Sequence, residues 1–226
     1  MTLTVYPQIE QRSDEWYDQR RGMVTASAVG QLVTPSTLKP ANNPATRSIT
    51  RLLVSERITG WTEPTFVSAD MWRGIEDEPR AVETYAEHYG VEVESCGFMV
   101  RDDHGWDIGF SPDGLVGDDG LIEIKSHAPK EHLAIILADV VPAKYMAQVQ
   151  CGLLVSGRLW VDLISFCGGM PMWVRRVTPD ERWMSAICDA VEAFELTAAE
   201  MVTTYRNATK GLAVTERIPN LDDIRI

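Results

Sequence analysis

The stretch SPDGLVGDDGLIEIKS, residues 111–126, decides which class of fold this chain adopts. Two short β-rich runs flank a centre rich in Gly and Asp, which is the pattern of a β-hairpin. Alternate side chains of a strand share a face, so Glu123 and Lys125 point to one side while Ile122 and Ile124 point to the other. The two isoleucines are expected to be buried, and an acid and a base are then presented together on the opposite face.

Asp113 lies on the preceding strand, and its place beside Glu123 depends on the loop between them. A four-residue loop at 117–120 would put Asp113 opposite Ile124, on the wrong face. A five-residue loop, or a one-residue bulge at 112–114, would bring Asp113 beside Glu123. Pro and Gly are the residues that mark such a bulge, so the sequence leaves both routes open.

Two carboxylates held close together repel, and both stay ionised only if a cation lies between them. Oxygen ligands select Mg²⁺ or Mn²⁺ rather than zinc. A nearby lysine suits phosphate chemistry, because it can stabilise developing negative charge or help to deprotonate a water. The alternative is a plain hairpin whose Glu123 and Lys125 are solvated. Spacing alone does not decide between the two, since acid-x-Lys triplets are common.

Glu78 is a third candidate carboxylate. A helix is expected over about 77–89, with Pro79 in its first turn, where the missing N–H costs nothing. On this helix Glu78 is the one acid on an otherwise buried face. It either gives a metal site its third carboxylate or serves only the positive end of the helix dipole.

Two glutamines stand in an otherwise apolar helical run, AKYMAQVQCGLLV. Gln148 and Gln150 are two residues apart and therefore point about 200° apart around the helix. At most one of them can face a site, and either could be an ordinary glutamine at the edge of the core.

Arg20, Arg21 and Ser27 surround a glycine at the junction of two predicted helices. Such a junction is a place where an anion can meet a helix N-terminus. The plainer interpretation is surface charge, which residue physics alone favours.

Composition fits one large domain with a substantial core. The chain has 226 residues, of which 45% are hydrophobic and 24% are charged. No run approaches the roughly 20 apolar residues of a membrane-spanning helix, and the first residues lack the pattern of a secretory signal. The formal net charge of −12 argues against bulk attraction to nucleic acid or membranes, although a small basic channel can lie on an acidic body.

The remaining metal-binding residue types show no metal-type spacing. The four cysteines are widely separated, so disulfides and a zinc knuckle are poorly supported and a reduced cytoplasm is expected. The four histidines are expected to be structural or at the surface (His88, His104, His127 and His132).

The order of elements indicates a single mixed α/β domain over 1–226, with a central sheet flanked by helices. A helical part extends to about 66, a core covers about 67–178, and a helix and tail cover about 179–226. Helices are expected over about 13–21, 48–59, 77–89, 130–156 and 179–208, strands over about 91–100, 158–167 and 171–177, and a loop over 35–47.

Four motifs in this order, WYDQRRGMVTAS, WRGIEDE, SPDG with EIK, and YMAQVQ, resemble the phage lambda exonuclease family of viral recombination nucleases (YqaJ-like recombinases). That family belongs to the PD-(D/E)XK nuclease superfamily, so the resemblance implies a restriction-endonuclease-like core. It covers about residues 12–178, and the four motifs together are far more specific than SPDG and EIK alone.

The resemblance also implies roles for individual residues. The family's metal ligands fall on Glu78, Asp113, Glu123 and the carbonyl of Ile124, and its catalytic lysine on Lys125. The position that contacts the scissile region falls on Gln148, which implies that this glutamine, not Gln150, faces the site. The family's pocket for the DNA 5′-phosphate falls on Arg20, Ser27 and Ser111, with Arg21 as a second arginine beside it.

The function implied is a Mg²⁺-dependent 5′→3′ exonuclease, with Mn²⁺ as a substitute, that degrades one strand of duplex DNA from its ends. The 3′ single-stranded overhangs would serve phage recombination. Family members form a toroidal homotrimer threaded by DNA, and a phage single-strand annealing protein is the implied partner. Two alternatives stay open. One is a CRISPR-associated or helicase-linked PD-(D/E)XK nuclease with a four-cysteine iron–sulfur cluster, and the other is a non-catalytic DNA-end binding protein.

Overall fold

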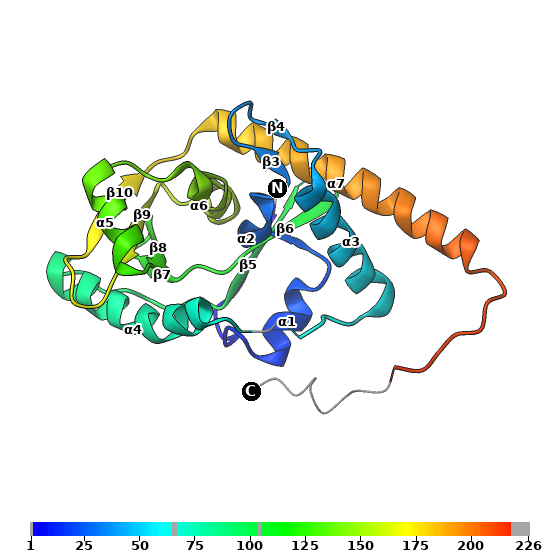
Figure 1. Cartoon of the computed structure of the whole chain (residues 1–226), viewed down its shortest axis with the longest axis horizontal. Helices are drawn as coiled ribbons and strands as arrows, with labels where there is room; N and C mark the ends of the chain where they lie inside the picture. Colours follow the sequence, from blue (N-terminus) through cyan, green and yellow to red (C-terminus); the bar gives the residue numbers. More distant parts are fainter. Residues whose placement is uncertain (1, 65–66, 104, 218–226) are drawn as a thin grey trace.

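The computed structural model describes residues 2–64, 67–103 and 105–217. The described chain is a mixed α/β body in which helices cover paired strands, as the order of elements predicts (Figure 1). The strands are β1 (Thr2–Tyr6), β2 (Val24–Thr25), β3 (Val33–Thr34), β4 (Lys39–Pro40), β5 (Phe98–Asp103), β6 (Trp106–Phe110), β7 (Gly114–Val116), β8 (Gly120–Ser126), β9 (Trp160–Phe166) and β10 (Trp173–Val177). The helices are α1 (Asp14–Arg20), α2 (Ala26–Val29), α3 (Pro44–Thr59), α4 (Ala69–Tyr89), α5 (Pro129–Ala138), α6 (Ala143–Ser156) and α7 (Glu181–Ala208).

The strands form two four-stranded sheets and a small hairpin, where the sequence suggested one central sheet. One sheet has the order β10-β9-β8-β7, with β8 and β9 parallel and the other pairs antiparallel. The other has the order β1-β5-β6-β2. The break falls between β6 and β7, at Ser111 and Pro112, because proline has no N–H to continue the ladder of hydrogen bonds.

The N-terminal segment is part of this body and not a separate helical unit. β1 pairs with β5 in a register that joins Thr2 to Asp102, and β2 pairs with β6 in parallel. The alternating apolar pattern of β1 was not recognised in the sequence, because its side chains are largely exposed and its partner lies far along the chain.

The hairpin of β7 and β8 has a three-residue turn, 117–119, and neither a five-residue loop nor a bulge. Gly114 pairs with Ile122 and Val116 with Gly120. Continued by one residue, the same register sets Asp113 opposite Glu123. The three-residue turn is one residue shorter than a four-residue loop, and this difference shifts the register by one position and moves the aspartate to the correct face.

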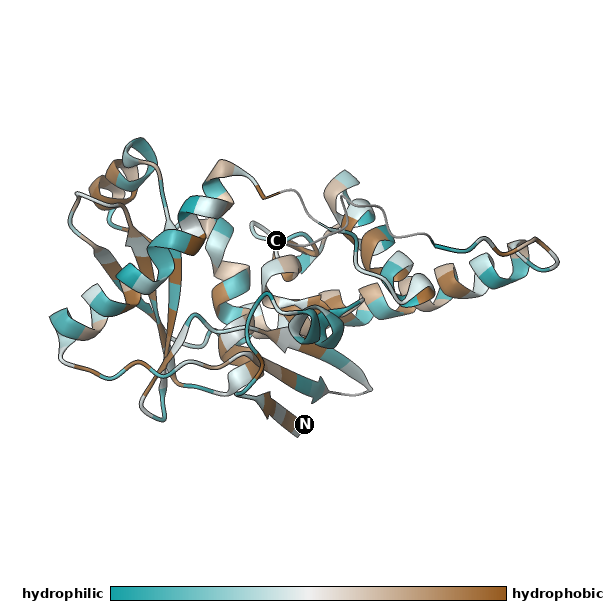
Figure 2. Cartoon of the chain, turned by 90° about the horizontal axis from the view of Figure 1, so that it is seen from below, coloured by the Kyte–Doolittle hydropathy of each residue, from teal (hydrophilic) through white to brown (hydrophobic). Residues whose placement is uncertain are grey.

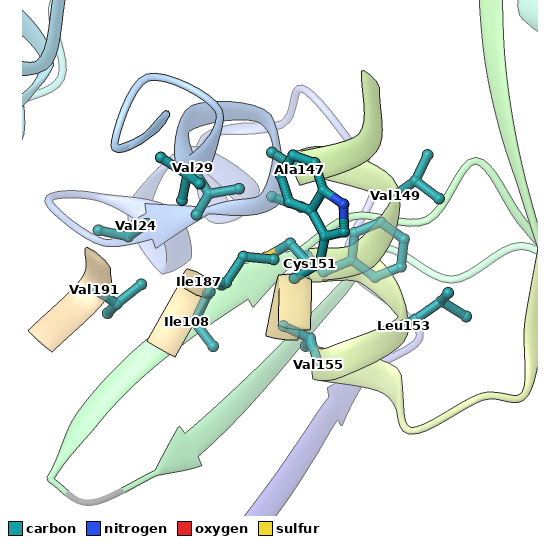
Figure 3. Close-up of a cluster of buried hydrophobic side chains, with 14 of the residues drawn as sticks. Val24, Val29, Ile108, Ala147, Val149, Cys151, Leu153, Val155, Ile187 and Val191 are labelled. Carbon is teal, nitrogen blue, oxygen red and sulfur yellow. The ribbon is translucent and has the colours of Figure 1, made fainter. Parts of the chain in front are cut away.

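Two clusters of buried side chains hold the sheets and helices together. Ile122 and Ile124 are buried against Ala81 and Tyr85 of α4, so the predicted apolar face of β8 is confirmed. The larger cluster surrounds α6 and joins it to β6, α2 and α7, with Cys151 at its centre (Figure 3).

Three helix boundaries differ from those expected. Pro79 lies inside α4, ten residues after its first residue Ala69, and not in a first turn. The expected helix over 130–156 is two helices, because Asp139 adopts a left-handed backbone (φ 54°) and Pro142 precedes the next helix. α3 begins at Pro44, capped by the side chain of Asn43, so the expected loop over 35–47 is shorter. It also contains β4, which pairs with β3 just before the loop.

The long helix α7 packs on the body through its first part, and its C-terminal end extends beyond the other elements (Figure 2). Its buried residues end at Ala198. Within the residues described, no helix is long and apolar enough to cross a membrane.

Gly97 and Gly74 offer a matched test of this packing. A Cβ on Gly97 would lie 1.8 Å from the backbone oxygen of Ile9, whereas a Cβ on Gly74, inside α4, meets nothing within 4 Å. Gly97→Ala is therefore expected to lower the free energy of unfolding by about 1–3 kcal/mol. Gly74→Ala is expected to raise it by roughly 0.5–1 kcal/mol. Urea denaturation of both variants measures this, and a Gly97→Ala protein as stable as the parent chain would contradict the packing described.

Candidate active site

A cavity of about 740 Å³ lies between the helices α1, α2, α4 and α6 and the strand β8, and residues of β2 and β6 also line it. All the candidate residues from the sequence line it: Arg20, Ser27, Glu78, Ser111, Asp113, Glu123, Ile124, Lys125 and Gln148. Residues up to 128 positions apart in the sequence, such as Arg20 and Gln148, are thus brought to one place.

Glu123, Lys125 and Gln148 form a closed hydrogen-bonded set on the floor of the cavity. The Lys125 ammonium donates to Glu123 Oε1 at 2.6 Å and to Gln148 Oε1 at 3.0 Å, and Gln148 Nε2 donates to the same Glu123 oxygen at 2.6 Å. Burial opposes the charge of Lys125, but the charges of Glu123 and Asp113 outweigh it, so the pKa of this lysine lies above its usual value. The neighbouring carboxylates therefore favour the charged form of Lys125.

Asp113 is half-buried beside the buried carboxylate of Glu123. Its Oδ2 accepts the backbone N–H of Ile124 at 2.6 Å, which fixes the carboxylate beside β8. Burial, followed by the negative charge of Glu123, raises the pKa of Asp113 well above its usual value, and the charge of Glu78 adds to this. Two repelling carboxylates at one wall of a cavity are a donor set that fits a hard divalent cation.

Glu78 lines the cavity from α4 and forms an ion pair with Arg12. Arg12 donates to Glu78 Oε2 at 2.7 Å, and both side chains are partly exposed. Arg12 has a left-handed backbone, with φ 72°, in the turn before α1. Within the part of the chain that the structure describes, no three His, Cys, Asp or Glu side chains form a preassembled metal cluster.

The arginine that enters the cavity is Arg20. Its Nη2 lies 3.2 Å from Ser27 Oγ and 3.3 Å from Thr25 Oγ1, and its guanidinium stacks 4.0 Å from the ring centroid of Trp16. The indole N–H of Trp16 donates to Ser111 Oγ at 2.8 Å. Arg20, Ser27 and Ser111 therefore converge, with Trp16 between them.

Arg21 points elsewhere. It pairs with Asp18 and donates to Thr62 Oγ1 at 3.3 Å, and it does not line the cavity. Burial lowers the pKa of Arg20 from its usual value, but a guanidinium remains charged in proteins. Of these two arginines, Arg20 is therefore the one that lines the cavity.

The two glutamines of α6 divide as the helical spacing requires. Gln148 faces the cavity, whereas Gln150 is buried on the other side and ties α6 to the start of α7. Its Nε2 donates to the carbonyl of Thr178 at 2.8 Å, and its Oε1 accepts the N–H of Asp180 at 2.8 Å.

Arg12 and Trp16 are cavity residues that sequence reasoning missed. Trp16 stands four residues before Arg20 on α1, so the i,i+4 spacing of an aromatic and a cation was an available signal. Arg12 meets Glu78 across 66 residues of sequence, and no local pattern indicates such a contact.

No disulfide joins the cysteines in the described part of the chain, and three of them, Cys96, Cys151 and Cys167, are buried. They do not form a cluster among the described residues, so the structure gives no support to the four-cysteine alternative. His127 and His132 are buried, as expected of structural residues, and His104 lies outside the described residues.

The raised pKa of Asp113 predicts that this carboxylate destabilises the metal-free chain. As pH rises from about 4, the usual pKa of Asp, toward the raised pKa, the unfolded chain gives up a proton that the folded chain keeps. Stability falls over this window. Asp113→Asn keeps an acceptor for the Ile124 N–H and removes this effect.

Asp113→Asn is therefore expected to be more stable than the parent chain at neutral pH in EDTA, by about 0.5–2 kcal/mol. The difference should shrink toward pH 4. Urea denaturation across pH 4–8 measures both quantities, with Asp118→Asn, in the turn, as a control. A less stable Asp113→Asn protein at neutral pH would contradict the strain described.

Comparison with known proteins agrees with this geometry. The family model of the YqaJ-like viral recombinase domain matches residues 15–159. The fold is similar to an alkaline exonuclease from Laribacter hongkongensis (LHK-Exo), with 30% sequence identity and a TM-score of 0.79, over 89% of this chain and 100% of that one. The structure of LHK-Exo in complex with dAMP gives a TM-score of 0.77 at 30% identity over the same shares of the two chains.

A phage-related exonuclease from Haemophilus somnus 129PT shares the fold at 12% identity, with a TM-score of 0.66 over 81% of this chain and 96% of that one. No curated protein sequence matches the chain. The family resemblance carried by the four sequence motifs is confirmed: the chain belongs to the family of YqaJ-like viral recombinases.

Proposed function

We propose that this protein is a Mg²⁺-dependent 5′→3′ exonuclease that degrades one strand of duplex DNA from its ends. The observation that carries the proposal is the convergence of Asp113, Glu123 and Lys125 in the same cavity as Arg20 and its two hydroxyl neighbours. A nuclease site and an anion site within one cavity suit an enzyme that holds a chain end while it cuts beside it. The exonuclease structures to which the chain is similar support the same activity.

Asp113, Glu123 and the Ile124 carbonyl would hold the cation, with Glu78 as the third carboxylate once Arg12 releases it. When bound, Mg²⁺ would supply Lewis-acid activation of the scissile phosphodiester; Mn²⁺ would substitute. Lys125 contributes a fixed positive charge beside Glu123 that stabilises the negative charge developing on the phosphate. Gln148 holds both Lys125 and Glu123 in place and presents its amide to the same region.

The second part of the cavity supports the proposed 5′→3′ direction. A terminal 5′-phosphate carries more negative charge than an internal diester and has one more free oxygen. Arg20, Ser27 and Ser111 offer a guanidinium and hydroxyls for such a group. An end held there places the next phosphodiester toward the carboxylates, so cleavage proceeds from the 5′ end and leaves a 3′ overhang. The complex of LHK-Exo with dAMP supports a cavity of this size binding a nucleotide.

The wider setting proposed is phage recombination in the host cytoplasm. The overhangs would be substrates for a single-strand annealing protein, and the active form would be a homotrimeric ring around DNA. A ring accounts for the net charge of −12, because acidic outer surfaces keep the protein soluble while basic side chains face the DNA.

The proposal is tested by digesting a linear duplex with 5′-phosphate ends in Mg²⁺ and in EDTA. A covalently closed circle of the same sequence serves as control. Loss of the linear duplex in Mg²⁺ alone, with the circle intact, is the expected result. Digestion in EDTA, or no digestion with any divalent cation, would refute the proposal.

Lys125→Ala is expected to lower kcat by about 10²-fold or more, because the positive charge it removes acts in the transition state. Affinity for duplex ends should change little. The initial rate of digestion at saturating DNA measures kcat, and Lys130→Ala, on the outer helix α5, is the matched control. A raised KM with an unchanged kcat would show that Lys125 only anchors phosphate.

Arg20→Ala is expected to reduce the preference for 5′-phosphate over 5′-hydroxyl ends by about 10- to 150-fold, the equivalent of roughly 1.5–3 kcal/mol for a charge-assisted contact. Arg21→Ala is the matched control, since Arg21 pairs with Asp18 outside the cavity. Paired digestion rates on duplexes that differ only in the 5′ group measure the preference. Equal cutting of both ends by the parent chain, or loss of preference in Arg21→Ala alone, would contradict the assignment.

A further inference from the structure

A buried chain of hydrogen bonds runs from the core to the wall of the cavity. His132 Nε2 lies 2.9 Å from the carbonyl oxygen of Pro171, and His132 Nδ1 lies 2.7 Å from Ser165 Oγ. The same Ser165 oxygen lies 2.8 Å from His127 Nδ1, and His127 Nε2 lies 2.7 Å from the hydroxyl of Tyr145. His132, Ser165 and His127 are each less than 5% exposed. None of these groups is used in the mechanism above.

The chemistry of the partners fixes the direction of every hydrogen bond in this chain. A carbonyl only accepts, so His132 Nε2 carries the proton. A buried imidazole with neutral partners is uncharged, so its Nδ1 accepts, and Ser165 donates its single hydrogen to it. The Ser165 oxygen must then accept from His127 Nδ1–H. His127 Nε2 is left as an acceptor, and Tyr145 donates to it.

The chain ends at the catalytic lysine. The Lys125 ammonium lies 5.5 Å from the centroid of the Tyr145 ring, and its two side-chain hydrogen bonds go to Glu123 and Gln148. Tyr145 and Gln148 are three residues apart on α6 and share a helix face. Lys125 and His127 are two residues apart, and the backbone N–H of His127 still pairs with β9. The end of β8 therefore carries Lys125, and directly after it lies His127, the residue whose Nε2 contacts the hydroxyl of Tyr145.

We propose that the chain His132–Ser165–His127 is a positioning device that, through the hydroxyl of Tyr145, holds the tyrosine ring against Lys125 in the geometry that catalysis needs. Burial lowers the pKa of His127, which keeps its Nε2 free to accept from Tyr145. The members of this hydrogen-bonded chain are neutral and add no charge beside Lys125. The Tyr145 ring also contacts the ammonium of Lys144, 4.8 Å from its centroid. This inference rests on the proposed function, in which Lys125 acts in catalysis.

Two substitutions at His127 separate the two halves of the chain. An Asn side chain reaches the place of Nδ1 and keeps the contact with Ser165, whereas a Gln side chain reaches the place of Nε2 and keeps an acceptor for Tyr145. Tyr145→Phe removes the same contact from the other side. Tyr85→Phe is the matched control. The buried hydroxyl of Tyr85 donates to Asp162 Oδ2 at a distance of 2.6 Å, and Tyr85 does not line the cavity.

Tyr145→Phe and His127→Asn are expected to lower kcat about tenfold, the loss typical when a residue behind a catalytic group is removed, with KM for duplex ends unchanged. His127→Gln should stay within about threefold of the parent chain. The double variant His127→Asn/Tyr145→Phe should lose no more than Tyr145→Phe alone, since both remove one contact. Tyr85→Phe should lose stability without losing kcat.

A parent kcat in Tyr145→Phe, equal losses in His127→Asn and His127→Gln, or multiplied losses in the double variant would overturn the inference. These results are distinct from failure of the proposed function, in which the parent chain itself digests nothing. In that case the hydrogen-bonded chain His132–Ser165–His127 is tested by the histidine tautomers, which two-bond ¹H–¹⁵N spectra of histidine-labelled protein measure. We expect His132 as the Nε2–H tautomer and His127 as the Nδ1–H tautomer, and the opposite tautomers would refute it.

Discussion

The repulsion between the half-buried carboxylate of Asp113 and the buried carboxylate of Glu123 is the constraint on which the rest of the site depends. The three-residue turn of the β7–β8 hairpin sets them opposite each other, and the Ile124 N–H holds Asp113 there. Burial and the negative charge of Glu123 raise the pKa of Asp113, and the positive charge of Lys125 offsets this only in part. Such strain persists only where the surrounding structure enforces it, and here the isoleucines of β8, locked against α4, do so.

The connection between the two sheets carries the second half of the cavity. Ser111 and Pro112 leave the ladder of hydrogen bonds, and both are tied to the N-terminal segment instead. Gln11 Nε2 donates to the Pro112 carbonyl at 2.9 Å, and Trp16 donates to Ser111. The segment that bears Arg20 is therefore tied to the same connection between β6 and β7 that carries Asp113. This explains how an anion site and a carboxylate site from distant segments keep a constant separation.

What the sequence predicts here is local, and what it misses is set by distant partners. The buried face of β8 follows from the alternation of residues 121–126, and the division of Gln148 from Gln150 follows from helical spacing. The hairpin register depends on one residue of loop length, which composition does not determine.

Features that depend on contacts between distant segments cannot be predicted from local sequence. Pro79 was read as a helix start because proline is commonest there, yet the apolar contacts of α4 with β8 hold a helix through it. Arg20 and Arg21 share one helical turn and differ only in the partners that the chain reversal at Gly22 offers them. The pairing of β1 with β5 crosses about a hundred residues.

Net charge and local charge give opposite expectations for a DNA end, and distance decides between them. Charges on the outer surface are screened over roughly 8 Å at physiological salt, so the −12 of the whole chain acts weakly inside the cavity. Arg20 and Lys125 act at hydrogen-bond distance and in partly buried surroundings, where screening is small. The carboxylates next to them would repel a phosphate if they remained uncompensated. A divalent cation between Asp113 and Glu123 would remove that repulsion and add attraction, so binding of the cation and binding of the DNA end should favour each other.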